Sequence, residues 1–156
     1  MRTNHCFALF MLLLLSCREN TNSKLSVSGD PSPIQGTWKL ISGTLIEKGN
    51  TTVTDYTKGK EFIKVINGTH FSFLSHSLNK KDTSSEAFSA GGGRYELSDS
   101  SYTEHLDYCS DRQWEGNSFP FTISMQGDTL IQKGIEKVDS IGVDRMNTEV
   151  YVRLKK

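Results

Sequence analysis

The residues of this chain that could do chemistry lie on short segments of alternating polarity. In the segment 101–109, one face of an extended strand would carry Tyr102, Glu104, Leu106 and Tyr108. This face is the more apolar of the two, so we expect Tyr102, Glu104 and Tyr108 to point into a core. A carboxylate in a core needs a partner or a ligand to offset its lost hydration. Glu104 is therefore the first candidate for a binding or catalytic role.

A histidine is the natural chemical companion of that carboxylate. The segment 69–76 alternates so that either His70 or Phe71 faces inward, not both. If His70 and Glu104 both pointed inward, they could bind a polar ligand, hold a metal or transfer protons as an acid–base pair. The more ordinary roles are a Glu104 hydrogen-bonded to a wall residue and a partly exposed His70. We identify no other candidate catalytic residue.

Other motifs that carry chemistry are weak or missing in the sequence. His76 and His105 add two metal candidates, but no HExxH or CxxC spacing joins them, so we expect no metal and no cofactor. No serine stands in a G-x-S-x-G context. The run Gly91-Gly92-Gly93 lacks the Lys-Ser/Thr of a phosphate loop. It indicates a flexible strand entry or a close approach of a backbone or a ligand.

The first residues resemble a bacterial lipoprotein signal. Arg2 precedes an apolar run, 6–15, that is too short for a membrane span of roughly 20 residues. The run ends on Leu14-Leu15-Ser16-Cys17, which is similar to a lipobox and implies cleavage before a lipidated Cys17. The alternative is an ordinary secretory signal that is cleaved elsewhere. We expect residues 1–16 to be a signal peptide, and the polar, turn-prone stretch 17–33 to be a flexible tether.

These features predict a location. A lipid on Cys17 would anchor the protein in the bacterial cell envelope, and we expect the outer membrane, with the periplasmic or surface face left open. In the mature chain Cys109 would have no cysteine to pair with, so it is either a small buried residue or a reactive thiol.

The composition limits the number of domains and the classes of function that the chain could have. The chain has 156 residues, of which 35% are hydrophobic, as in an ordinary single globular domain, and we place that domain at 34–156. The formal net charge of +0 and the pI near 6.9 exclude the basic footprint of a nucleic-acid binder.

From Ile34 onward the apolar residues recur with period two between turn signals, which predicts an all-β fold. The Asn67-Gly68 pair predicts a hairpin with a type I′ turn. About eight antiparallel strands could stack as a sandwich or close into an up-and-down barrel of 8 to 10 strands. We expect strands at 37–41, 61–66, 69–76, 94–97, 101–109, 119–125, 129–133 and 148–154, with further strands near 44–54.

Two residue patterns favour the barrel. Gly36 and Trp38 near the start, with Arg153 near the end, resemble the lipocalin and fatty-acid-binding superfamily, in which such a Trp packs under a C-terminal Arg. The segments 62–71, 91–97, 102–105 and 149–153 resemble a lipocalin-like domain of unknown function from secreted proteins and lipoproteins of Bacteroidetes. The resemblance implies a calycin-type barrel with an interior cavity, an envelope location, and no settled ligand or activity.

The sequence thus predicts an envelope lipoprotein whose barrel binds a small, partly apolar ligand. One alternative is an enzyme that uses His70 and Glu104; the other is an accessory subunit of an envelope complex. Binding predicts a sizeable cavity, whereas an interaction module predicts a filled barrel and an exposed apolar patch. Trp114 could stack on a ligand at the barrel mouth or pack on its rim. The candidate pocket residues are Tyr95, Tyr102, Glu104, Tyr108, Phe121 and Ile123.

Overall fold

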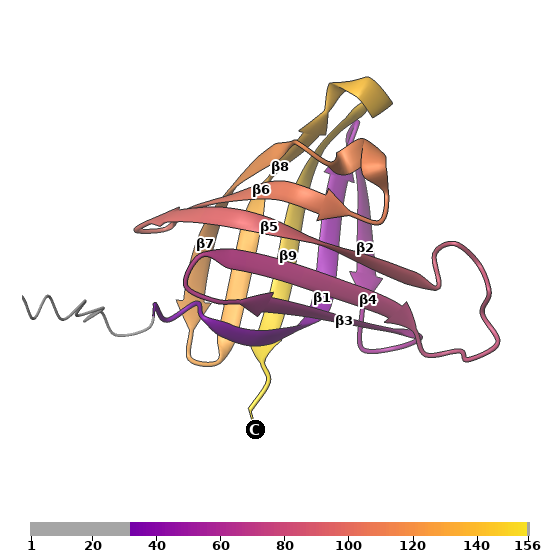
Figure 1. Ribbon diagram of the computed structural model, residues 1–156, viewed down its shortest axis with the longest axis horizontal. Helices are drawn as coiled ribbons and strands as arrows, with labels where there is room; N and C mark the ends of the chain where they lie inside the picture. The colour runs from indigo at the N-terminus through magenta and orange to yellow at the C-terminus, as the bar shows by residue number, and fades with distance from the viewer. Residues whose placement is uncertain (1–31, 156) are drawn as a thin grey trace, which may run out of the picture.

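The computed structural model describes residues 32–155, and in this range the chain forms nine antiparallel strands and two short 3-10 turns (Figure 1). The all-β prediction is confirmed. The predicted signal peptide, Cys17 and most of the predicted tether lie outside the described residues. Between residues 32 and 155 there is no helix of the length and apolarity needed to cross a bilayer. The elements are β1 Gly36–Glu47, β2 Asn50–Asp55, β3 Lys60–Ile66, β4 His70–Ser77, β5 Phe88–Ser98, β6 Ser101–Cys109, η1 Arg112–Trp114, β7 Ser118–Gln126, β8 Thr129–Val138, η2 Asp139–Ile141 and β9 Val143–Arg153.

Eight of these strands close into an up-and-down barrel. Strands β3 to β9 pair in sequence order, β9 pairs with β1, and β1 pairs with β3. The ninth strand, β2, continues along the same edge of β1: residues 36–39 of β1 pair with β3, and residues 42–47 pair with β2. The architecture is consistent with a calycin-type fold. Closure pairs both edges of the sheet except along β2, whose six residues are all exposed.

One end of the barrel is closed by its own side chains. Trp38 is fully buried, and the guanidinium carbon of Arg153 lies 4.1 Å from the centroid of its ring. The indole Nε1 donates to the carbonyl oxygen of Ile34 at 2.8 Å, and Arg153 Nη1 donates to that of Gln35 at 2.7 Å. The expected contact between Trp38 and Arg153 is therefore present. It ties the last strand to the segment that enters the first, and Gly36 leaves room for the guanidinium, which a Cβ there would meet.

The β3–β4 connection is a hairpin, as predicted, but its turn is not type I′. Neither Asn67 nor Gly68 has a positive φ. Instead the side-chain oxygen of Asn67 accepts the backbone N–H groups of Thr69 and His70, both at 2.8 Å. Two successive positive φ angles occur at Lys48 and Gly49, between β1 and β2. The local hydrogen bonds of Asn67 stabilise a longer loop and thereby overrule the predicted turn.

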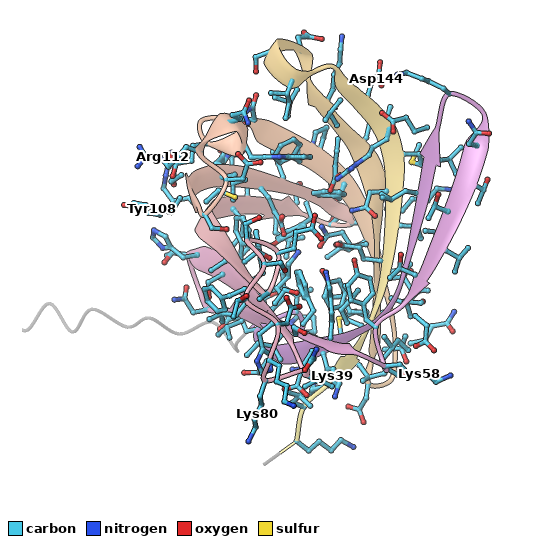
Figure 2. The ribbon with its side chains drawn as sticks, turned by 90° about the vertical axis from the view of Figure 1, so that its right-hand side faces the viewer. Lys39, Lys58, Lys80, Tyr108, Arg112 and Asp144 are labelled. Atoms are coloured by element: carbon cyan, nitrogen blue, oxygen red, sulfur yellow. The ribbon has the colours of Figure 1, made fainter. Side chains whose placement is uncertain are left out.

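A bulge in β6 corrects the predicted orientation of Tyr108. Gly93 of β5 pairs with Leu106 and Gly92 pairs with Tyr108, so Asp107 is an extra residue in β6. The alternation reverses at this point, and Tyr108 is 71% exposed on the outer surface (Figure 2). The prediction that Tyr108 points inward is wrong for this reason. The glycine run lies within β5 rather than at its entry, and a Cβ on Gly93 would overlap the carbonyl oxygen of His105.

Candidate functional site

A cavity of about 340 Å³ occupies the half of the barrel away from Trp38 and Arg153. Exposed residues of its lining, Thr54 after the β1–β2 turn and Ser110 and Asp111 before η1, mark its opening. Figure 2 shows η1, near Arg112, and the β1–β2 hairpin on opposite sides of the barrel. The barrel is therefore packed at one end and hollow toward the other.

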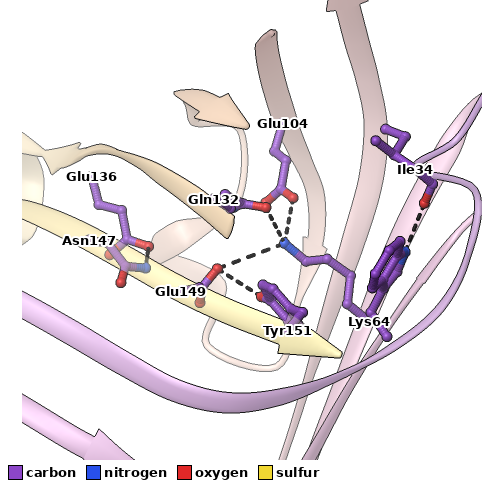
Figure 3. Close-up of polar contacts among 9 residues, drawn as sticks. Ile34, Lys64, Glu104, Gln132, Glu136, Asn147, Glu149 and Tyr151 are labelled. Atoms are coloured by element: carbon purple, nitrogen blue, oxygen red, sulfur yellow. Dashed lines mark hydrogen bonds and ion pairs between the residues drawn. The ribbon is translucent and has the colours of Figure 1, made fainter. Parts of the chain in front are cut away.

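A buried ionic cluster forms the floor of this cavity. Lys64, on β3, is 2% exposed, and its Nζ donates to Glu104 Oε1 at 2.7 Å and to Gln132 Oε1 at 3.0 Å (Figure 3). Glu149 Oε2, on β9, lies 4.0 Å from the same nitrogen. The ammonium also lies 5.2 Å from the centroid of the Tyr151 ring. Because a buried ion pair is tolerated only when hydrogen bonds satisfy it, this cluster must hold a defined geometry.

Glu149 is held in an environment that disfavours its charge. Its Oε2 accepts a hydrogen bond from the hydroxyl of Tyr151 at 2.7 Å. Burial raises the pKa of the Glu149 carboxyl, as do the nearby Glu136 and Glu104, while Lys64 acts in the opposite direction. Burial also raises the pKa of Tyr151, and the charge of Glu149 adds to that shift.

A second ion pair lies higher in the cavity, where β8 and β9 extend toward η2. Arg145 Nε lies 2.7 Å from Glu136 Oε2, and Asn147 Nδ2 donates to Glu136 Oε1 at 2.8 Å. The guanidinium carbon of Arg145 lies 5.1 Å from the centroid of Trp114 in η1. Trp114 also packs on Phe119, with ring centroids 5.9 Å apart. It therefore packs on the rim while remaining part of the cavity lining.

One wall of the cavity is aromatic. Phe62 stacks on Phe73 at 5.5 Å between centroids, and Tyr56 meets Phe62 edge-on at 6.1 Å. Phe62 in turn lies 6.4 Å from Tyr151, which connects this wall to the ionic floor. The arrangement offers a ligand aromatic faces beside charged groups.

The predicted pocket residues are divided by the structure. Glu104 and Phe121 line the cavity. Tyr95, Tyr102 and Ile123 do not: Tyr95 is half-buried and its hydroxyl donates to the carbonyl of Asn67 at 2.7 Å, and Ile123 belongs to the packed core. Tyr102 points inward as expected and is 1% exposed. Its hydroxyl has no hydrogen-bond partner within residues 32–155.

The histidine–carboxylate pair considered from the sequence does not form. Phe71 takes the inward position and is 3% exposed, whereas His70 is exposed and its Nδ1 lies 2.8 Å from the Thr69 hydroxyl. Glu104 lies inside the barrel. His105 also belongs to the outer face, with Nδ1 2.8 Å from the Ser118 hydroxyl. In the described part of the chain, no three His, Cys, Asp or Glu side chains gather in a way that could hold a metal.

Cys109 faces the cavity because of the β6 bulge. It is half-buried and unpaired among the described residues, and burial raises the pKa of its thiol. This environment favours the thiol over the reactive thiolate.

Most of the polar residues in the cavity were missed by sequence reasoning. Each lies on a strand whose opposite face is at least as apolar, so alternation alone does not place it inside. A usable signal is a charged residue two positions from an aromatic one, as in Phe62/Lys64 and Glu149/Tyr151. The residues missed are Lys64, Gln132, Glu136, Arg145, Asn147 and Glu149.

Comparison of the sequence with protein-family models and with curated proteins gives no match. The eight-stranded barrel supports a calycin-type fold at the level of architecture. Function therefore has to be argued from the residues of the cavity, since a fold of this kind serves many functions.

Proposed function

We propose that this protein binds a small, partly apolar molecule inside its barrel. The observation that carries the proposal is the open cavity of about 340 Å³, with an aromatic wall and a floor built on Lys64, Glu104 and Glu149. Small-molecule sites are commonly cavities of about 300–1,000 Å³ with apolar walls and a few convergent polar groups. The apolar wall would take the body of the ligand and the ionic floor would orient its polar end.

The same cavity weighs against the two alternatives. A barrel that serves only as an interaction module has no reason to leave such a volume open, because an unfilled core loses packing energy. The hypothesis of an enzyme with a His70–Glu104 acid–base pair is weakened, because His70 lies on the outer surface and Glu104 lies inside the barrel. Ligand binding uses the observed groups without requiring any of them to move.

We further propose that the barrel is anchored in the bacterial cell envelope through a lipid on Cys17 and is related to the lipocalin-like domains of Bacteroidetes. The lipobox-like Leu14-Leu15-Ser16-Cys17 supports the anchor, and the contact between Trp38 and Arg153 supports the relationship. Labelled palmitate should be incorporated by the wild type and by Cys109→Ser but not by Cys17→Ser. Equal labelling of both variants would contradict lipidation at Cys17.

Native mass spectrometry of the full chain, released from detergent, tests binding directly. We expect a small molecule that leaves the protein on denaturation. Ser89→Trp, which places an indole in the cavity lining, should abolish it. Thr122→Trp is the matched control, because Thr122 is exposed outside that lining. An empty wild-type barrel, or a molecule retained by Ser89→Trp, would overturn the proposal.

A further inference from the structure

The charges inside the cavity do not pair evenly. Among the described residues six acidic or basic side chains line the cavity: Asp111 at its opening, and Lys64, Glu104, Glu136, Arg145 and Glu149 in its interior. Lys64 pairs with Glu104 at 2.7 Å and Arg145 pairs with Glu136 at 2.7 Å. Glu149 is the remaining one in the interior. Its nearest cation is Lys64 at 4.0 Å, and the hydrogen bonds of that ammonium go to Glu104 and Gln132.

Space and an aromatic ring lie beside this unmatched carboxylate. The neighbours of Glu149 across the sheet are Gly43 on β1 and Gln132 on β8. Gly43 has no side chain, and the ring of Tyr56 takes that place, 3.1 Å from where a Cβ would stand. Tyr56 begins the aromatic wall that continues through Phe62. Gly43, Tyr56 and Glu149 all line the cavity, so a group held in the cavity beside Glu149 would contact a carboxylate and an aromatic ring at once.

We infer that the bound molecule carries one positive charge, an ammonium group on an apolar, preferably aromatic body, and that Glu149 is its counter-ion. This inference rests on the proposed function, because it names the chemical class of the ligand in the same cavity. The ammonium would complete the pairing of charges, and the faces of aromatic rings attract a desolvated cation. An anionic ligand would instead meet three carboxylates and an ammonium that is already hydrogen-bonded.

The surroundings of Glu149 predict how this binding responds to pH. The groups that face it are Lys64 from β3, Glu104 from β6, Gln132 and Glu136 from β8, Tyr151 from β9, and Tyr56. Burial raises the pKa of the free Glu149 carboxyl, and a bound cation would lower it again. Binding of the cation should therefore release protons and weaken as the pH falls, whereas binding of a neutral molecule should not.

Calorimetric titration of the full chain in detergent at about pH 8, with three probes that share a phenylethyl body and differ in their polar end, tests the charge preference. The probes are 2-phenylethylamine, 2-phenylethanol and 3-phenylpropanoate. We expect the amine to bind at least about tenfold more tightly than the alcohol, and the carboxylate most weakly. Glu149→Gln should remove the advantage of the amine and leave the alcohol unchanged. Glu149→Asp, which keeps the charge, should retain part of it.

Glu96→Gln is the matched control, because it removes one negative charge from a side chain that is 79% exposed outside the barrel. It should bind all three probes as the wild type does. If Glu149→Gln does not fold, the wild-type pH profile decides: amine affinity that falls between about pH 8 and pH 5, with constant alcohol affinity, supports the inference. A flat amine profile overturns it.

The outcomes separate the two proposals. Equal binding of amine and alcohol, both lost in Ser89→Trp, overturns the charged-ligand inference and leaves the binding function in place. An amine advantage that persists in Glu149→Gln also overturns the inference. If no probe binds and native mass spectrometry finds no released molecule, both proposals fail.

Discussion

Lys64 carries a charge into the interior of the barrel, and the groups around it explain how the barrel tolerates that charge. Its nitrogen has two short hydrogen bonds to side-chain oxygens and lies near the rings of Tyr151 and Phe71. Each contact recovers part of the hydration energy that burial removes. The position is therefore sensitive, because the loss of one partner would leave a nearly buried charge without its compensating hydrogen bond.

Lys64→Met should accordingly destabilise the fold by about 3–5 kcal/mol, since it leaves Glu104 buried without its cation. The double variant Lys64→Met/Glu104→Gln should recover at least half of that loss. Urea denaturation measures both. Lys39→Met is the control: Lys39 pairs with Glu61 at the surface, where an ion pair contributes at most about 1 kcal/mol. If Lys64→Met and Lys39→Met lost similar amounts of stability, burial of the Lys64 cluster would not increase the cost of losing its cation.

The orientation of single residues was predictable only where one face of a strand is clearly the more apolar. Glu104 met that condition through Tyr102 and Leu106. In β9 the pattern is misleading: Val150 and Val152 suggest that their own face is inward, yet Tyr151 is fully buried and Glu149 lines the cavity. The aliphatic residues face outward there because the interior of a ligand-sized barrel need not be apolar.

At the scale of elements, the β5–β6 pair shows how an irregularity redirects side chains. The extra residue Asp107 reverses the alternation, so that Tyr108 leaves the interior and Cys109 enters it. The strands themselves were predictable from period-two hydrophobicity and turn residues. The bulge was not predictable in this way. It accompanies a close approach of Gly93 to the backbone of β6, and such a contact does not change the alternation of polar and apolar residues in the sequence.

Gly93→Ala should therefore destabilise the protein by at least about 2 kcal/mol, because the added Cβ would overlap the backbone of His105 and force the strands apart. Thermal unfolding checks this. The control is Gly68→Ala, which has ordinary φ and no heavy atom nearer than 3.9 Å, and should change stability by less than about 0.5 kcal/mol. A large effect at Gly68 would favour the type I′ turn after all.

At the scale of the whole molecule, the barrel is closed at one end by contacts between distant parts of the chain. Arg153, at the end of β9, lies over Trp38 and donates to backbone carbonyls of residues 33 and 35. The resemblance of Gly36, Trp38 and Arg153 to a known superfamily was enough to predict this contact. The shape of the cavity was not predictable, because it depends on residues from all nine strands together.

Arg153→Ala should lower stability by about 1–3 kcal/mol, the sum of a lost cation–π contact and lost hydrogen bonds. Arg153→Lys should recover only part, because an ammonium cannot reach both carbonyls in the geometry of a guanidinium. Urea midpoints compare the two variants with Lys155→Ala, which removes an exposed charge nearby and should be neutral. If Arg153→Lys were as stable as the wild type, the positive charge of Arg153 would account for its whole contribution to stability.

The dependence of the free energy of unfolding on pH is a property of the whole molecule, and Glu149 predicts the direction of one contribution to it. Its folded-state pKa is raised, so between the unfolded and folded pKa values the folded state binds more protons than the unfolded state. Stability from this group is present at low pH and is lost as pH rises through the folded pKa. Glu149→Gln removes that loss, so the variant should gain stability relative to the wild type as pH rises from about 5 to 8. Urea denaturation of both proteins across this range measures the difference, and Glu86→Gln, at an exposed position outside the cavity lining, should show no such trend. A difference that shrinks with rising pH would mean that Lys64 outweighs burial and that Glu149 is already matched by a cation.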